Sequence, residues 1–273
     1  MSNKGYMWVC QNNGKTDYAE LSRSLARSLK EHNKDNLVCV LTDKDTQSAL
    51  SKIPEIDIVN VMSEDDSVDH DIKWANEYKV FSRSPFTHTI KLAADMLWTT
   101  NTDWWWNYLW QHDMVFAVDC FNYKNKRVGL NQTYRPFHKK NFLPNIYSDL
   151  TYFRKSRKSV AFGKICQMLT QNWQQVRESM LINCHDKYPS TDVVYALAYR
   201  IIDPVNKDLV DYPWFKFIHN KRFIHGLTNV REPGKYLTPY KVKQKVMLGG
   251  HALTRPWHYV DKNTVEDLNA RIF

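Results

Sequence analysis

Apolar runs and amphipathic stretches alternate along the first 120 residues of the chain. Three runs, at residues 7–10, 37–42 and 58–61, consist mainly of apolar side chains, and each gives way to polar residues. Residues 18–32 carry apolar side chains at every third or fourth position, which predicts an amphipathic helix. Continuous apolar runs separated by a helix are typical of parallel strands covered on both faces, so the pattern predicts an α/β fold.

The same pattern extends through the rest of the chain. Two more strands are predicted at 89–93 and 114–118, and three more helices at 74–82, 159–180 and 192–201. A long basic loop is expected over 124–140, with short strands and turns from residue 203 onward. We find no internal repeat, low-complexity tract or linker, so one α/β domain over residues 1–273 is the simplest organisation.

The charge balance is basic, with 38 Lys and Arg against 29 Asp and Glu, a formal net charge of +9 and a pI near 9.2. A basic chain of this kind accommodates a polyanionic partner. No run of about 18 apolar residues occurs, so we expect no membrane span and no membrane partner. The five cysteines are odd in number and form no C-x-x-C pair, which favours reduced thiols in a cytoplasmic protein.

Residues 89–97 carry the clearest chemical signal. A strand-like run leads into Asp95, and the chain then continues apolar. In open α/β sheets, ligands bind beyond the carboxyl ends of the strands, so this carboxylate is placed to reach a site. A carboxylate at that point suits a divalent cation that bridges a diphosphate. The alternative is an acidic residue that only caps a turn.

The segment Leu92–Leu97 (LAADML) resembles the L-D-A-D-M-L form of the D-x-D motif in GT-A glycosyltransferases. It is most similar to the glycogenin-like retaining enzymes that use UDP-sugars. Five other segments resemble motifs of that family in the same order, namely 11–18, 40–43, 147–153, 189–192 and 250–257. The resemblance implies a mostly parallel, Rossmann-like sheet in a single GT-A domain. Residues 1–120 would hold the nucleotide-sugar, and an elaborated half, 121–273, would hold the acceptor.

The resemblance also implies which residues form the site. Those implied at the nucleotide-sugar are Asn12, Tyr18, Lys79, Ala93, Asp95 and Arg255, with Asp149 and Asp192 near the transferred sugar as catalytic candidates. Asp95 and His251 are the implied metal ligands, and the implied cofactor is Mn²⁺ or Mg²⁺. The anomeric configuration is expected to be retained.

Three departures from the family pattern leave alternatives open. Ala93 stands where the first Asp of D-x-D belongs, and either an engineered replacement or a natural loss accounts for it. Arg255 stands where the family has Lys, and its planar guanidinium also suits a phosphate. The spacing between His251 and that basic residue is two residues shorter than in the family, which keeps His225 as a rival metal ligand.

Ordinary structural roles compete with several of these assignments. Asp192 begins a predicted helix, so it also fits as an N-capping residue. Asp149 fits a solvated loop equally well, and Lys79 fits an exposed surface. The Trp-rich segment 104–110 fits a bulky helix start that packs beneath the D-x-D loop, or a platform on which bases or sugars stack.

Basic residues interleaved with aromatic ones are concentrated after residue 120. The four taken as DNA contacts are Arg127, Arg135, Lys139 and Lys140. Carbohydrate acceptors rarely need such charge, whereas a nucleic acid does. The chain as a whole resembles the sugar transferases of T-even-like bacteriophages that modify 5-hydroxymethylcytosine in DNA, and among them the arabinosyltransferases. This resemblance implies a UDP-sugar donor, a DNA acceptor and, for a phage-encoded protein, the host-cell cytoplasm.

Two other functions compete with this hypothesis. An envelope glycosyltransferase acting on lipopolysaccharide would share the fold, the donor and the metal. Neither end of the sequence shows the basic amphipathic helix that would support membrane docking. A non-catalytic nucleic-acid-binding protein on the same fold would have Ala93 as its natural residue.

Overall fold

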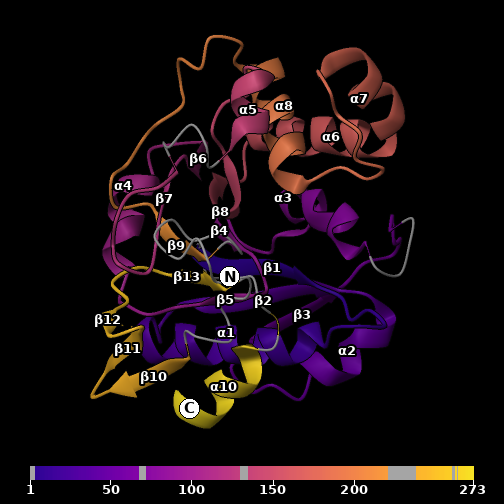
Figure 1. The fold of residues 1–273 in the computed structure, drawn as a ribbon. Helices are drawn as coiled ribbons and strands as arrows, with labels where there is room; N and C mark the ends of the chain where they lie inside the picture. The colour runs from indigo at the N-terminus through magenta and orange to yellow at the C-terminus, as the bar shows by residue number, and fades with distance from the viewer. Residues whose placement is uncertain (1–3, 68–71, 130–134, 221–237, 260–261, 263) are drawn as a thin grey trace.

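A six-stranded sheet forms the centre of the computed structural model, which describes residues 4–67, 72–129, 135–220, 238–259, 262 and 264–273. Its strand order is β3-β2-β1-β4-β8-β6 (Figure 1). The strands are β1 (Lys4–Cys10), β2 (Leu37–Thr42), β3 (Ile58–Val61), β4 (His88–Leu92), β6 (Met114–Ala117) and β8 (Tyr147–Arg154). β1 pairs in parallel with β2 and β4, and β2 with β3, whereas β8 runs antiparallel to β4 and β6. The mostly parallel α/β sheet predicted from the sequence is confirmed.

Helices cover both faces of this sheet (Figure 1). On one face lie α1 (Tyr18–His32) and α2 (Lys44–Leu50), and on the other lie α3 (Val80–Arg83), α6 (Arg157–Gln171) and α8 (Thr191–Ile202). Among the described residues, no helix combines the length and the apolar character needed to cross a bilayer.

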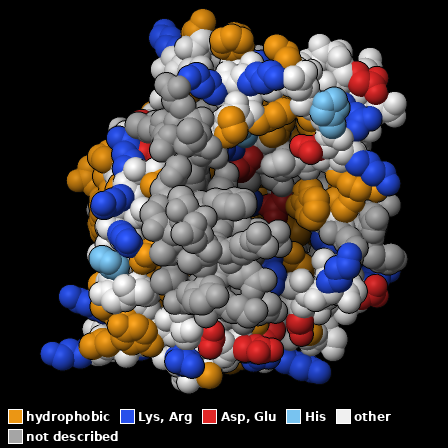
Figure 2. All heavy atoms as spheres, viewed as in Figure 1, with side chains coloured by type: hydrophobic (Ala, Val, Ile, Leu, Met, Phe, Trp, Pro, Cys, Tyr) orange, Lys and Arg blue, Asp and Glu red, His pale blue; other side chains and the backbone are white. Residues whose placement is uncertain are grey.

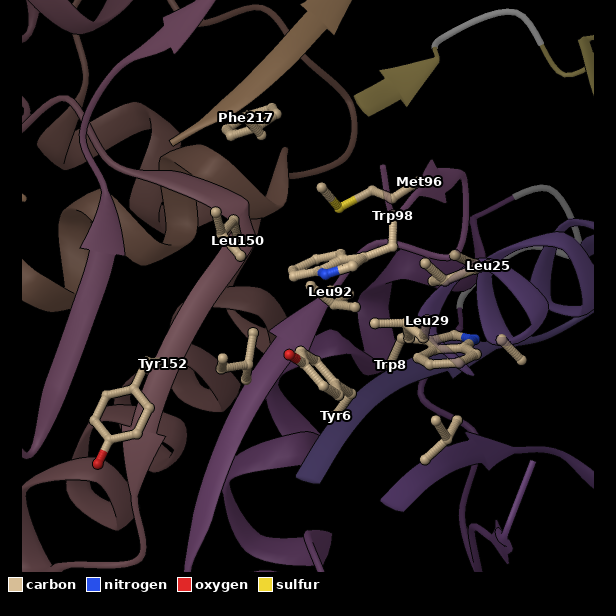
Figure 3. Packing of buried hydrophobic residues seen from close by; sticks show 14 of the residues in the cluster. Tyr6, Trp8, Leu25, Leu29, Leu92, Met96, Trp98, Leu150, Tyr152 and Phe217 are labelled. Carbon is tan, nitrogen blue, oxygen red and sulfur yellow. The ribbon is translucent and has the colours of Figure 1, made fainter. Parts of the chain in front are cut away.

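Side chains that alternate along β1 divide the core in two. Tyr6 and Trp8 point to the α1 side, where they pack in one cluster with Leu25 and Leu29 (Figure 3). Met7 points to the opposite side, into a second cluster formed with α3, α6 and α8. A strand that is buried on both faces needs an apolar side chain at nearly every position, which explains the continuous apolar runs in the sequence.

A smaller sheet joins the C-terminal part of the chain to the first half. Its order is β5-β13-β9-β7, with β5 (Met96–Leu97), β7 (Cys120–Phe121), β9 (Phe217–Asn220) and β13 (Trp257–Tyr259). A third sheet contains β10 (Pro239–Val242), β11 (Lys245–Leu248) and β12 (His251–Ala252). Helix α10 (Thr264–Arg271) packs against α1, where Asn269 donates a hydrogen bond to Glu20 at 2.7 Å. Segments near the C-terminus therefore pack directly against segments of the first half of the chain.

Hydrophobic periodicity located most elements of the first half. The bounds predicted for one helix and two strands are those observed for α1, β2 and β3, and the strands predicted at 89–93 and 114–118 correspond to β4 and β6 within one residue. The helix expected over 74–82 is a 3₁₀ helix, η1 (Lys73–Lys79), followed by α3. Within η1 the buried Asn76 donates its amide to Gln11 at 2.8 Å, so a polar side chain occupies an inward position there.

Several elements of the second half differ from the prediction. The single helix expected over 159–180 is two helices, α6 and α7 (Trp173–Met180). They separate at Asn172, whose side chain donates to Met168 O at 2.8 Å and so competes with the helical backbone bonds. The expected basic loop contains α5 (Pro136–Lys140), in which proline occupies the first turn. Helices α2 and α10 were not predicted, because stretches of seven or eight residues give little periodicity.

The Trp-rich segment forms η2 (Asp103–Trp105) and α4 (Trp106–Leu109). Trp105 and Trp106 are buried, and Trp105 meets Trp98 edge-on with ring centroids 5.7 Å apart. Because Trp98 directly follows β5, these two side chains pack behind the D-x-D segment, as the packing hypothesis expected. Trp104 and Trp110 remain partly exposed, so the segment does not face a single core.

Candidate active site

A cavity of about 220 Å³ opens at the carboxyl ends of β1 and β4. The strand order reverses between these two strands, because β2 and β3 lie beyond β1 while β8 and β6 lie beyond β4. Such a switch point leaves a crevice that open α/β sheets use for ligands. The lining includes Tyr18, Lys73, Glu77, Lys91, Ala93, Asp95, Asp149, His258 and Lys262.

Asp95 lies in the turn between β4 and β5, directly before β5, and is buried in the wall of this cavity. Its Oδ2 accepts a hydrogen bond of 2.9 Å from His258 Nε2 and another from Lys262 Nζ. Burial alone would raise the pKa of Asp95, but the charges of His258 and Lys262 hold that pKa well below its usual range. Asp95 therefore stays ionised, with both partners drawn from the C-terminal part of the chain.

His258 lies between two carboxylates, since its other ring nitrogen, Nδ1, is 3.3 Å from Asp149 Oδ2. Asp149 belongs to β8, and its carbonyl accepts a hydrogen bond of 3.2 Å from Ala93 N. Burial would lower the pKa of His258, but Asp95 and Asp149 together raise it to about 10. The two carboxylates thus share one imidazolium.

Glu77 and Lys91 form a second charged pair in the same wall. Lys91 is almost fully buried, and its Nζ also donates to Ser148 O at 3.0 Å. Burial raises the pKa of Glu77, and the neighbouring Lys91 opposes that rise. The cavity therefore presents carboxylates and ammonium groups side by side, which suits a polar ligand that carries both hydroxyls and phosphates.

The loop between β1 and α1 forms another wall of the cavity. Asn13 and Tyr18 line it, and the Tyr18 ring centre is 5.7 Å from Lys262 Nζ. Asn12 instead fastens the start of α1, because its Oδ1 accepts a hydrogen bond of 2.9 Å from Ala19 N. The resemblance implied that both residues contact the nucleotide. In the structure Tyr18 lines the cavity, whereas the Asn12 side chain is hydrogen-bonded to the first turn of α1.

Asp192 and Arg135 form an ion pair beneath the start of β8. Asp192 Oδ1 accepts from Ser148 N at 2.7 Å and from Ser148 Oγ at 2.8 Å, while its Oδ2 accepts from Arg135 at 2.7 Å. Both carboxylate oxygens are thus engaged by the chain itself, and the N-cap of α8 is Ser190 rather than Asp192. Arg135 is only 8% exposed, which contradicts its predicted contact with DNA.

Lys79 and Arg255 make contacts away from the cavity lining. Lys79 is buried, donates to Glu64 O and lies 3.3 Å from the carboxylate of Asp66. The Arg255 guanidinium lies 3.9 Å from the centre of the Phe121 ring. Their predicted contacts with phosphate have no counterpart in this cavity, where the lining cations are Lys73, Lys91 and Lys262.

Of the two histidines considered as metal ligands, the one that the structure describes, His251, does not line the cavity. His251 is exposed on β12, where its ring centre is 5.7 Å from that of Tyr123. Its rival, His225, lies outside the described residues. The histidine beside Asp95 is His258, seven positions after His251.

The remaining basic residues taken as DNA contacts lie at the surface. Lys139 and Lys140 are exposed on the short helix α5. Arg127 is also exposed, although its guanidinium contacts Asp119 and lies 3.3 Å from Asp211. Two of the four predicted contacts are therefore exposed lysines, and Arg127 is partly neutralised by acidic neighbours.

Sequence reasoning missed His258, His219 and Lys262. His219 and His258 are opposite each other in the parallel pairing of β9 with β13, although 38 residues separate them in the chain. Each of these histidines lies in a short, aromatic, strand-like stretch, at 217–220 and 257–259, and this pattern could have predicted that both lie on strands. Lys262 has no such signal, since no motif connects it with Asp95.

Comparisons with known proteins agree with this architecture. No family model matches the sequence, and no curated protein matches it. Among solved structures, the galactosyltransferase LgtC, in complex with donor and acceptor sugar analogs, is similar with a TM-score of 0.54 at 12% identity, covering 98% of this chain and 96% of that chain. Apo mouse xyloside xylosyltransferase 1 has a TM-score of 0.50 at 11% identity, covering 96% of this chain and 98% of that chain. The protein therefore has the fold of the GT-A glycosyltransferases.

Proposed function

We propose that this protein is a glycosyltransferase that moves a sugar from a UDP-sugar to 5-hydroxymethylcytosine in phage DNA, with arabinose as the first sugar to test. The observation that carries the transferase assignment is the acidic and basic cavity at the switch point of a GT-A sheet. Ligands bind at such switch points because strand ends and loops converge there. Asp95, which the sequence pointed to, lies in its wall.

The cavity offers separate groups for the parts of a nucleotide-sugar. Tyr18 provides an aromatic face beside the loop implied to hold the uracil, and Lys73 and Lys262 provide cations for a diphosphate. Asp149 and Glu77 provide acceptors for sugar hydroxyls. A divalent cation, when bound, would add positive charge where the leaving diphosphate becomes more negative.

The charge distribution supports a polyanionic acceptor. Residues 121–273 contain 26 Lys and Arg against 11 Asp and Glu, whereas residues 1–120 contain 12 against 18. The net charges of these segments are therefore +15 and −6, so the positive excess lies wholly in the half assigned to the acceptor. Lys and Arg side chains stand along the rim of the molecule over α5 (Figures 1 and 2). Such charge suits phosphate contacts, which supply most of the affinity for DNA.

The donor assignment is tested by calorimetry with UDP, ADP and GDP, each with and without Mn²⁺. We expect UDP to bind most tightly and its affinity to fall when the metal is chelated. Equal binding of all three nucleotides, unaffected by chelator, would refute the UDP-sugar assignment.

The acceptor assignment is tested by filter binding across a salt series. Each phosphate contact contributes about 0.9 to the slope of log affinity against log salt. Charge reversal at the exposed residues Lys124, Lys126, Lys139 and Lys140 is therefore expected to weaken DNA binding and to flatten the slope, with UDP affinity unchanged. Reversal at Lys34 and Lys52, exposed in the first half, is the matched control and should leave both affinities unchanged.

The reaction itself is tested by mass spectrometry of DNA incubated with the protein and a panel of UDP-sugars. Hydroxymethylated duplexes should gain the mass of one sugar per modified base, while unmodified DNA should bind but gain nothing, because it lacks the hydroxyl. The base has to leave the stack to reach a cavity of this kind. Transfer to a polysaccharide, together with salt-insensitive or absent DNA binding, would instead identify an envelope enzyme.

A further inference from the structure

Two histidines from neighbouring strands meet beside the cavity, which one of them, His258, lines. His219 of β9 and His258 of β13 are register partners, and their rings stack with centroids 5.0 Å apart and planes 10° apart. Asp149 of β8 reaches the same point, so that one ligand atom from each of the three side chains lies within 4.8 Å of the others. Three different strands thus deliver one carboxylate and two imidazoles to a common centre.

The two nitrogens of His258 have different surroundings. Nε2 is held by Asp95 Oδ2 at 2.9 Å. Nδ1 is buried and lies 3.3 Å from the carboxylate of Asp149, in a contact that does not meet hydrogen-bond geometry. A metal-bound histidine characteristically has one nitrogen oriented by a carboxylate and the other turned to the metal. Nδ1 faces the centre shared with Asp149 and His219, which is the arrangement that a metal ion would complete.

We propose that Asp149, His219 and His258 bind a divalent transition metal, and that Asp95 acts as a positioning residue for His258 rather than as a ligand. One carboxylate and two imidazoles suit Mn²⁺, Fe²⁺, Co²⁺ or Zn²⁺ better than Mg²⁺, which prefers oxygen ligands throughout. Three protein ligands leave coordination positions open, as catalytic metal sites do.

This ligand set differs from the one expected from the D-x-D resemblance. Asp95 is already engaged by His258 and Lys262, and position 93 has no carboxylate. His251 is exposed on β12 and is absent from the cavity lining. The role of the metal in sugar transfer rests on the proposed function, whereas the binding of metal to these residues does not.

The test is a titration of the chelator-treated full-length protein with Co²⁺, followed by visible absorption, and with Mn²⁺, followed by calorimetry. We expect one ion per chain and Co²⁺ bands typical of mixed nitrogen and oxygen ligands. Asp149→Asn and His219→Gln preserve side-chain size and should each weaken binding at least about tenfold. Asp95→Asn should also weaken it and should shift the Co²⁺ bands, because the orientation of His258 changes. His251→Ala is the matched control and should bind as the wild type does.

Two outcomes would overturn the proposal. One is a wild-type chain that binds neither Co²⁺ nor Mn²⁺. The other is binding that survives Asp149→Asn and His219→Gln but is lost in His251→Ala. UDP calorimetry on the same samples separates this inference from the proposed function. Metal binding without UDP binding would support the metal site and refute the transferase assignment. UDP binding without metal binding would support the transferase assignment and refute the metal site.

Discussion

At the scale of single residues, Asp192 is a carboxylate that holds two elements together. It accepts two hydrogen bonds from Ser148 in β8 and one from the buried Arg135. Arg135 is buried, whereas the Asp192 side chain is 24% exposed, so the loss of Asp192 leaves a buried guanidinium without compensation, at a cost near the lower end of about 3–5 kcal/mol. We therefore expect Asp192→Ala to lower the free energy of unfolding by about 3 kcal/mol in urea titrations.

The control for that experiment is Asp208→Asn. Asp208 pairs with Lys158 at 2.6 Å, but its side chain is 60% exposed, so its loss should change the stability by about 1 kcal/mol or less. If Asp192→Ala were as stable as the wild type while sugar transfer disappeared, the residue would act on the substrate instead of on the fold.

Ala93 is the residue at which the sequence and the proposed activity conflict. It lines the cavity beside Asp95, and its backbone nitrogen donates to Asp149 O. We expect Ala93→Asp to restore a second carboxylate at this wall and to raise turnover at least about tenfold, equivalent to about 1.4 kcal/mol at the barrier. Initial rates with a saturating UDP-sugar measure the effect. An unchanged rate in Ala93→Asp would favour alanine as the natural residue.

At the scale of elements, the contact between α3 and α6 depends on a glycine. A Cβ on Gly163 would lie 2.8 Å from Phe81 Cβ, so even alanine requires one helix to move. Overpacking of this kind costs about 1–3 kcal/mol, which outweighs the gain of about 1 kcal/mol from the better helix propensity of alanine. Gly163→Ala should thus lower the midpoint of thermal unfolding.

The matched control is Gly14→Ala, because a Cβ at Gly14 would meet no atom within 4 Å. Its unfolding midpoint should equal or slightly exceed that of the wild type. Equal or greater stability of Gly163→Ala would show that α3 and α6 adjust without strain.

At the scale of the whole molecule, the C-terminal helix packs against the first half of the chain. Leu268 of α10 is fully buried in a cluster that includes Leu21 of α1 and Leu97 of β5. Leu268→Ala should lower the free energy of unfolding by about 2–5 kcal/mol. Because residues 1–273 are expected to form one domain, tryptophan fluorescence and far-ultraviolet circular dichroism should report one shared transition in both proteins. Two separate transitions would contradict the single-domain interpretation.

The sequence by itself located five strands of the central sheet and its first helix, and it pointed to four residues that line the cavity: Tyr18, Ala93, Asp95 and Asp149. Strands buried on both faces must be apolar throughout, and an amphipathic helix must repeat every three to four residues, so β2, β3 and α1 could be located from local pattern alone. Asp95 could be found because a charge at the end of a buried strand is conspicuous, and because the position of strand ends in an α/β sheet is known in advance.

Only the tertiary structure decided which side chains meet Asp95. His258 reaches it because β13 pairs with β5, and His219 joins His258 because β13 also pairs with β9. β5 and β13 are more than 100 residues apart in the sequence. The local periodicity of the chain therefore cannot predict that they pair. The same holds for Arg135, whose charge suggested an exposed DNA contact but whose ion pair with Asp192 buries it. The charge and spacing of side chains can be read from the sequence. Their burial and their interaction partners are decided only when strands that are distant in the sequence pair.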